Sequence, residues 1–227
     1  MKPLEELVNL EEPGWGLVEE WMRTATNAVE VLPKDSHRAP QELVNMQVTT
    51  RSPMGAIVYE SGGILVDHGW LRILGSGHPR LDRGLFGWNQ GRTIHKPGEP
   101  PSHLLIADDL LGGYFAVNAG GLGPKMGKVH YLSQDRMEWE CLDTTYSEFV
   151  HWAFHGDLDK FYQGFRWKTW QQDAKAASGH QVFSFYPFLW SKEGSEIEKC
   201  HRELVSIEEQ YRLTMEFRKK LAPSGSE

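Results

Sequence analysis

The chain has 227 residues, with 24 Lys and Arg against 31 Asp and Glu and a formal net charge of −7. This acidic balance counts against a protein that binds duplex DNA or an anionic membrane surface, since both partners need a basic face. The absence of a long apolar run, of an apolar leader within residues 1–6 and of more than two cysteines predicts a cytoplasmic protein without a disulfide framework.

The first strong pattern is a run of apolar residues at three- and four-residue spacing. Its members are Trp15, Val18, Trp21, Met22, Ala25, Ala28, Val29 and Leu32. This spacing predicts one amphipathic helix over residues 15–32, and Pro33 would end it. A short helix is expected to follow from Pro40.

From about Met46 the pattern changes to that of strands. Residues 55–60 and 64–67 are predicted to be two extended runs that glycines separate, and residues 70–74 are predicted to be a further strand. Residues 75–102 are rich in Gly, Pro, His and Arg, which predicts a long irregular insertion. Three apolar residues inside it, Leu85, Phe86 and Trp88, are expected to pin it to the body.

Further strands are predicted in the second half of the chain, followed by short helices. The expected strands are residues 104–107, 114–117, 128–132, 137–142 and 182–186. Thr145 and Glu148 have the spacing of a capping box, so a helix should begin there and run to about Phe154. Shorter helical segments are expected at residues 157–162 and around Trp167 and Trp170.

The C-terminal part is predicted to be one long helix. Ser195 and Glu198 have capping-box spacing, and the helix would run to about Leu221 before a disordered tail at residues 223–227. Its seam of apolar residues resembles that of a coiled coil: Ile197, Cys200, Leu204, Ile207 and Tyr211. A second apolar face leaves two alternatives, burial against the rest of the chain or a homodimer contact.

These elements together predict a single α+β domain over residues 1–222. It would have a mixed, largely antiparallel sheet flanked by helices on one side and at the ends.

Two local patterns suggest a metal or phosphate site but fail in detail. His151 and His155 have the spacing of a zinc pair on a helix, but no strong third ligand accompanies them. The glycine-rich residues 120–128 lack the first glycine and the final Ser or Thr of a phosphate-binding loop, so a wide hairpin turn is expected instead. No cofactor and no metal are therefore predicted.

The residues between Gly112 and Phe154 resemble the SUKH superfamily of bacterial immunity and cell-wall-regulator proteins. The matching segments are Gly112–Asn118, Gly127–Leu132, Glu138–Leu142 and Tyr146–Phe149. Residues 59–75 resemble an uncharacterised bacterial family, the domain of unknown function 2625. This resemblance implies a SUKH-like fold. Asn118 stands where the superfamily has an acidic residue, and the insertion at 75–102 has no counterpart in its minimal domain.

Two functions follow as hypotheses. The resemblance implies a non-catalytic protein-binding domain with an immunity or scaffold role, whose partner would be a toxin-like domain or a scaffold client. The alternative is a small hydrolase that uses Asp67, His68 and one member of the pair Asp108-Asp109. No recognisable nucleophile motif accompanies this acid and base cluster, so the binding hypothesis is preferred.

The expected binding surface lies beside glycine-rich strand ends. Its predicted residues are Asp67, Trp70, Gly112, Gly113 and Asn118. Tryptophans in loop contexts, such as Trp70 and Trp88, have two interpretations. They mark a partner surface, or they pin loops to the body.

Overall fold

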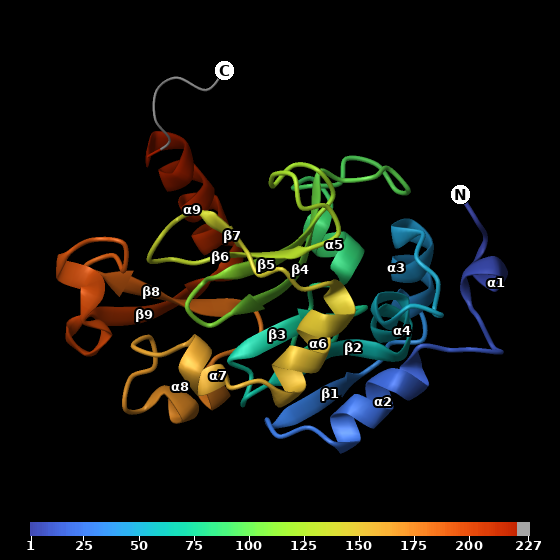
Figure 1. Cartoon of the computed structure of the whole chain (residues 1–227), viewed down its shortest axis with the longest axis horizontal. Coiled ribbons are helices and arrows are strands. Elements are labelled where there is room, and N and C mark those ends of the chain that lie inside the picture. The colour runs from blue at the N-terminus through green and yellow to red at the C-terminus, as the bar shows by residue number, and fades with distance from the viewer. Residues whose placement is uncertain (222–227) are drawn as a thin grey trace.

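Seven strands form one antiparallel sheet, in which each strand lies beside the next one along the chain (Figure 1). They are β1 Val29–Pro33, β2 Ser61–Val66, β3 Leu71–Leu74, β4 His103–Asp109, β5 Tyr114–Asn118, β6 Val129–Leu132 and β7 Trp139–Cys141. A second, two-stranded sheet pairs β8 Gln181–Tyr186 with β9 His201–Ser206. The computed structural model describes residues 1–221, so the predicted disordered tail at 223–227 lies outside the described residues.

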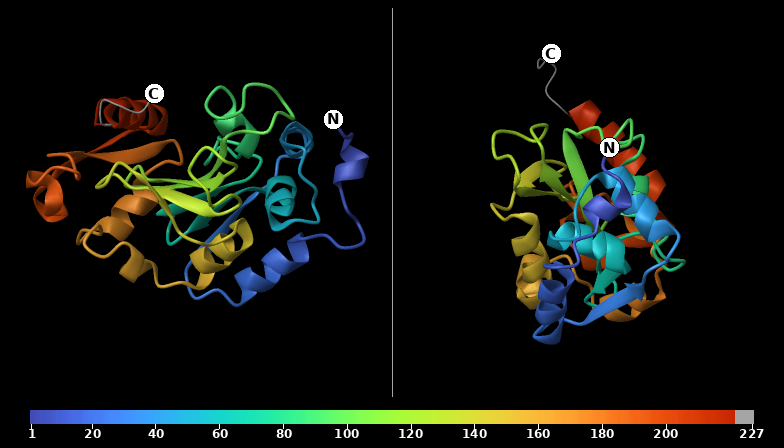
Figure 2. Two further views of the ribbon diagram at one scale, coloured as in Figure 1. Left: turned by 45° about the horizontal axis from the view of Figure 1, so that its top comes forward. Right: turned by 90° about the vertical axis from the view of Figure 1, so that its right-hand side faces the viewer.

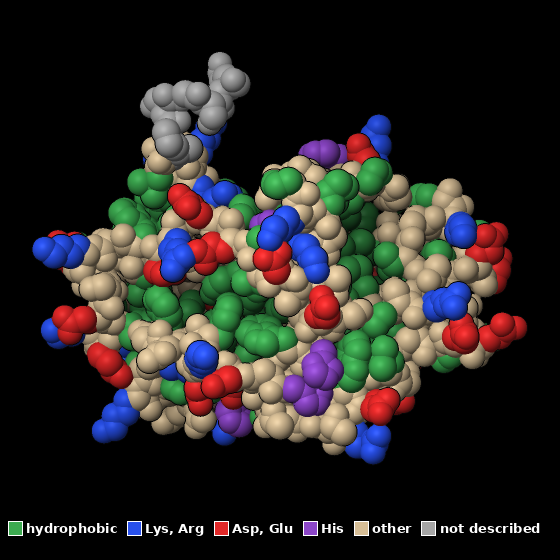
Figure 3. Space-filling model, in the orientation of Figure 1, with side chains coloured by type: hydrophobic (Ala, Val, Ile, Leu, Met, Phe, Trp, Pro, Cys, Tyr) green, Lys and Arg blue, Asp and Glu red, His purple; other side chains and the backbone are tan. Residues whose placement is uncertain are grey.

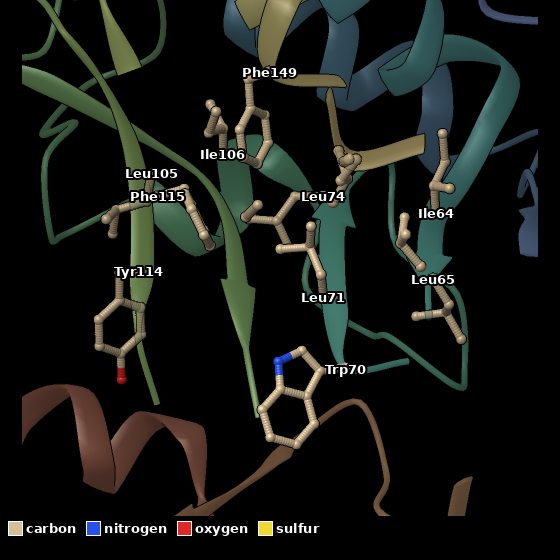
Figure 4. Close-up of a cluster of buried hydrophobic side chains, with 14 of the residues drawn as sticks. Ile64, Leu65, Trp70, Leu71, Leu74, Leu105, Ile106, Tyr114, Phe115 and Phe149 are labelled. Carbon is tan, nitrogen blue, oxygen red and sulfur yellow. The ribbon is translucent and has the colours of Figure 1, made fainter. Parts of the chain in front are cut away.

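Helices cover both faces of the large sheet, which confirms the α+β class but places helices on more than one side (Figure 2). They are α1 Leu4–Leu7, α2 Trp15–Arg23, α3 Arg38–Met46, α4 Pro53–Glu60, α5 Leu85–Asn89, α6 Tyr146–His155, α7 Leu158–Phe161, α8 Trp170–Ala176 and α9 Ile207–Leu221. On one face Phe115 packs on Phe149 of α6, with 4.9 Å between ring centroids. On the other face Tyr114 points toward α9 and its ring lies 5.0 Å from that of Tyr211 (Figure 4).

The strands expected at 64–67, 70–74, 104–107, 114–117, 128–132, 137–142 and 182–186 are all present, with shifts of a few residues at their ends. The capping box at the start of α6 is confirmed as well. The Thr145 hydroxyl accepts from the Glu148 amide, and the Glu148 carboxylate accepts from the Thr145 amide at 2.7 Å. These bonds satisfy two of the free amides at the helix N-terminus.

Replacing Thr145 with Ala should lower the free energy of unfolding by about 1 kcal/mol, because the first turn of α6 loses its cap. Urea unfolding followed by circular dichroism measures this loss. Ser147→Ala is the matched control, since no side-chain hydrogen bond of Ser147 is present among the described residues. Equal losses in the two variants would contradict a capping role for Thr145.

The predicted helix over 15–32 is correct only in its first half. α2 ends at Arg23, and Val29–Pro33 forms the edge strand β1, which pairs with β2. The chain leaves the helix because the amides of Thr26 and Asn27 donate to the Phe154 carbonyl of α6, at 3.1 and 3.0 Å. Apolar residues of a following strand had continued the helical spacing by coincidence.

The predicted extended run at 55–60 is wrong, because these residues form α4. The Ser52 side chain caps the helix by accepting from the Gly55 amide at 3.1 Å, and Pro53 occupies its start. Residues 55–58 are all buried, so the segment has no polar face to display a helical period. A Cβ at Gly55 would lie 2.1 Å from the Thr49 carbonyl oxygen, so the close approach of these two segments requires glycine.

The predicted C-terminal helix begins twelve residues later than expected, at Ile207 instead of Ser195. The Ser195 hydroxyl donates to the Lys192 carbonyl and caps nothing, and the residues that follow include β9. Every residue of β9 pairs with a residue of β8, and this cross-strand pairing replaces the helix. The predicted seam is therefore not one helical face, and the homodimer stays a prediction.

The insertion at 75–102 is largely irregular, as expected, and α5 lies within it. Leu85, Phe86 and Trp88 are buried, so their predicted pinning role is confirmed. Asn89 completes the attachment, since its side chain donates to the Leu105 carbonyl and accepts from the Leu105 amide, both at 2.8 Å. The insertion is thus bonded directly to the middle of β4.

Candidate functional site

Four of the five predicted binding residues lie at one end of the large sheet. Asp67 and Trp70 belong to the turn between β2 and β3, and Gly112 and Gly113 to the turn between β4 and β5. The two turns are joined, because the Leu110 amide donates to the Trp70 carbonyl at 2.9 Å. Asn118 is the last residue of β5, at the opposite end of the sheet, so the structure does not bring all five together.

Asp67 and Trp70 take part in internal packing. The Trp70 side chain is 0% exposed and lies among the rings of Tyr162, Trp167 and Trp170, with centroid distances of 5.2 to 5.5 Å. Arg166 forms an ion pair with Asp67 and stacks its guanidinium on Trp170 at 3.9 Å. The turn between β2 and β3 is therefore held by an aromatic cluster and an arginine.

Gly112, Gly113 and Asn118 also have local structural roles, in a turn and in a loop. Gly112 has a φ of +79°, which an L side chain rarely adopts, and a Cβ at Gly113 would lie 2.5 Å from the Tyr131 hydroxyl. The Asn118 side chain accepts from two amides and donates to two carbonyls of the loop at 119–127. These contacts account for the side chain's hydrogen-bonding capacity, and a binding role for the three residues stays a prediction.

Asp108 is the centre of a buried ionic cluster on the face of the sheet that β8 and α9 cover. Its carboxylate accepts from Arg72 Nε at 2.6 Å and from Arg83 Nη1 at 2.5 Å. All three side chains are nearly inaccessible to solvent. Arg72 also donates to the Gln181 carbonyl and Arg83 to the Gly179 carbonyl, so the cluster attaches β8 and the loop before it to the sheet. We call these three residues the buried triad.

Asp109 points to the other face and has different partners. Its carboxylate accepts from the hydroxyls of Tyr131 and Tyr162, at 2.7 and 3.1 Å, and from the Gly113 amide at 2.9 Å. Burial raises the pKa of Asp109, and these donors oppose that rise. The neighbouring carboxylate raises the pKa of both tyrosines further above the level that burial alone gives. Asp109 thus organises the turn around Gly113.

The acid and base cluster of the hydrolase hypothesis is not assembled. The carboxylate of Asp67 binds Arg166, that of Asp108 binds two arginines, and that of Asp109 faces away from them. In the part of the chain that the structure describes, none of these carboxylates is hydrogen-bonded to His68. The hydrolase alternative needs a histidine base that a carboxylate orients, and these residues do not form such a pair.

His68 instead borders a cleft of about 530 Å³, within the range of small-molecule sites. Its floor is a row of residues that pair across three strands, Glu30 on β1, Leu65 on β2 and Arg72 on β3. Paired residues in a row point to the same face of a sheet. The walls come from the turn at 67–69, from Arg80 and from residues 174–179. We call this space the Arg72 cleft.

The rim of the Arg72 cleft is basic and locally strained. Lys175 and Arg80 are exposed there, and Arg80 pairs with Glu30 through its two terminal guanidinium nitrogens. His68 has a φ of 64°, in the left-handed region that non-glycine residues rarely adopt. Such strain gathers at functional sites more than elsewhere. The sequence signal for this site is Arg72, a charged residue in the otherwise apolar run at 70–74.

A second candidate region is a group of aromatic side chains at the end of the small sheet. It consists of Tyr186, Phe188, Trp190 and Phe217, which we call the aromatic surface. Phe188 stacks on Trp190, with centroids 5.4 Å apart and planes at 9°, and both rings meet Phe217 edge-on. Tyr186 is 71% exposed and Trp190 36%.

Trp190 is not one of the tryptophans, Trp70 and Trp88, whose loop context suggests a partner surface. Trp70 and Trp88 are buried, which favours the interpretation that they pin loops to the body, and a binding role for Trp70 stays a prediction. The apolar hollow at the centre of the face in Figure 3, between β5–β7 and the helices α6 and α7, is a weaker candidate. A pocket of about 40 Å³ between β6 and α7 has room for little more than a water molecule.

The two rejected motifs have structural explanations. His155 binds the Thr24 hydroxyl with Nε2 and the His151 carbonyl with Nδ1, and the two imidazoles stack at 4.2 Å. The glycine-rich residues 120–128 lie in the connection between the paired strands β5 and β6, so the expected hairpin is confirmed. Among residues 1–221 no helix is long and apolar enough to cross a membrane.

Comparison with known proteins identifies the family. The model described as "Protein of unknown function DUF2625" matches residues 4–210, so the chain belongs to this family. An uncharacterized protein of Haemophilus influenzae is 46% identical over 211 residues, which cover 93% of this chain and 92% of that protein. A putative uncharacterized protein YbfG of Escherichia coli is 43% identical over 218 residues, with 96% and 98% covered. The predicted family is confirmed, and the wider SUKH likeness stays a prediction.

Proposed function

We propose that this member of the DUF2625 family acts as a non-catalytic binding protein and holds a protein partner on the aromatic surface. The observation that carries the proposal is the exposure of Tyr186 and Trp190 beside the stacked ring of Phe188. Tyr and Trp are the residue types that most often dominate the binding energy of protein interfaces. Two exposed rings that are already held by neighbouring rings lose little conformational freedom on binding.

The remaining parts of the binding hypothesis belong to the same proposal. A toxin-like domain or a scaffold client is the partner that the SUKH resemblance implies, and the cytoplasm is where the two would meet. The net charge of −7 favours a basic partner by electrostatic complementarity. A second copy of the chain is the competing occupant, because Phe217 of α9 is part of the aromatic surface.

The double variant Tyr186→Ala/Trp190→Ala should lose the partner while its melting temperature stays close to that of the wild type. Truncation of two interface hot spots weakens binding by at least about thirtyfold. The tagged chain is purified from the bacterium that encodes it, co-purifying proteins are identified by mass spectrometry, and the affinity for the identified partner is then measured by calorimetry. The matched control is Leu10→Ala/Leu17→Ala, which also removes two exposed apolar side chains.

Three results would contradict the proposal. A partner bound equally well by both double variants would place its site elsewhere. Turnover of generic ester or phosphoester substrates, with Asp67 and His68 required for it, would favour the hydrolase alternative. A dimer in light scattering that the aromatic variant converts to a monomer would identify a second copy as the occupant.

A further inference from the structure

The buried triad carries more positive than negative charge. Arg72 and Arg83 share the single carboxylate of Asp108, and the neighbouring Asp109 faces the opposite side of the sheet. The other contacts of the two guanidinium groups are with the Gln181 and Gly179 carbonyls and with the ring of Trp88, and none of these carries a net charge. Removing one charge from water without a counter-ion costs several kcal/mol of desolvation free energy.

The excess positive charge of the buried triad lies beside the Arg72 cleft, because Arg72 is one of the residues that line it. Arg72 is part of the floor of that cleft, while Asp108 is its neighbour in the same cross-strand row on the buried side. On the open side the cleft has two further cations, Arg80 and Lys175, against one carboxylate, that of Glu30. Three cations thus converge on one recess of a chain whose net charge is −7.

We propose that the Arg72 cleft binds a small organic oxyanion, a carboxylate or a phosphate ester. The anionic group would offset the excess positive charge of the buried triad from the side of Arg72 and contact Arg80 and Lys175 at the rim. Guanidinium groups suit this class of ligand, because their planar donors match the oxygens of carboxylate and phosphate.

The other lining residues indicate what the uncharged part of the ligand is like. Leu65 on the floor and Pro79 and Ala177 in the walls are apolar, and the ring of His68 lies 6.4 Å from that of Trp170. A flat or aliphatic group of modest size fits such walls better than a second charged group. This site is independent of the aromatic surface, with which it shares no lining residue.

Three aromatic probes test the site: benzoate, phenyl phosphate and benzamidine. Benzamidine has nearly the shape of benzoate but the opposite charge. Benzoate or phenyl phosphate should bind at millimolar concentration and shift the NMR signals of His68 and Lys175, and benzamidine should not. A stronger response to phenyl phosphate would identify a phosphate ester as the ligand, and a stronger response to benzoate a carboxylate.

Variants that change the charge of the rim test whether the cleft attracts anions. Arg80→Glu/Lys175→Glu should weaken binding at least about tenfold, because both charges that face the anion are reversed. Glu30→Gln should tighten it several-fold, since the competing carboxylate is removed from Arg80. Lys192→Glu, an exposed charge reversal outside the cleft, should leave the affinity unchanged.

The proposal is overturned if none of the probes binds, or if benzamidine binds as well as benzoate. It is also overturned if the two rim variants change the affinity no more than Lys192→Glu does. Unfolding curves of every variant accompany the titrations, and the altered side chains are all exposed, so loss of the fold is recognised separately from loss of the site.

Discussion

Replacing Asp108 with Asn should lower the free energy of unfolding by about 3–5 kcal/mol, because it leaves two buried arginines without a counter-charge. The guanidinium groups of Arg72 and Arg83 both donate to this carboxylate, and the three side chains are nearly inaccessible to solvent. Asn retains the size of the side chain, so the loss reports charge and not a cavity. Urea unfolding, followed by tryptophan fluorescence, measures it.

Two further variants test whether the loss of stability comes from the buried, unbalanced charge. Arg83→Met should cost less than Asp108→Asn, because the remaining pair of Arg72 and Asp108 is electrically balanced. Asp143→Asn removes an exposed carboxylate that pairs with Lys125, and it should cost no more than about 1 kcal/mol. If Asp108→Asn is no worse than Asp143→Asn, the buried triad does not hold the small sheet to the large one.

Most of the sheet was predictable because its strands end at strong turn signals. β4 and β5 are separated by Gly112 and Gly113, and β2 and β3 by a turn that includes Gly69. The errors have a common physical cause, since in each case contacts distant in sequence overrode a local pattern. The middle of α4 is buried, the segment that leads into β1 is bonded to α6, and β9 is held by pairing with β8.

The candidate sites were less predictable than the fold. Glycine placement led to Gly112 and Gly113, which shape a turn, while the Arg72 cleft is formed by residues from β1, β2, β3 and the segment at 174–179. Lys175 and Glu30 are far apart in the sequence, and nothing in either local segment indicates that they share a recess. Arg72 was the accessible clue, because a charged residue in an apolar strand must find a buried partner.

The second large effect is expected at Trp70, which sequence reasoning placed on a binding surface. Trp70→Ala should lower the free energy of unfolding by about 3–5 kcal/mol, because it opens a cavity inside a packed aromatic cluster. The indole contacts Tyr162, Trp167 and Trp170, so its loss loosens α8 and the segment before it together. Thermal and urea unfolding of the variant measure this loss directly.

Trp70→Phe separates the volume of the ring from its polar group. The Trp70 Nε1 donor is buried and has no acceptor among the described residues, so removing it relieves a desolvation cost. The smaller ring still fills part of the space, and we therefore expect Trp70→Phe to lose much less stability than Trp70→Ala. A fully stable Trp70→Ala that loses only the partner would restore the surface role. An equal loss in both variants would mean that the ring packs too tightly for any substitute, because only the indole then fits between the three neighbouring rings.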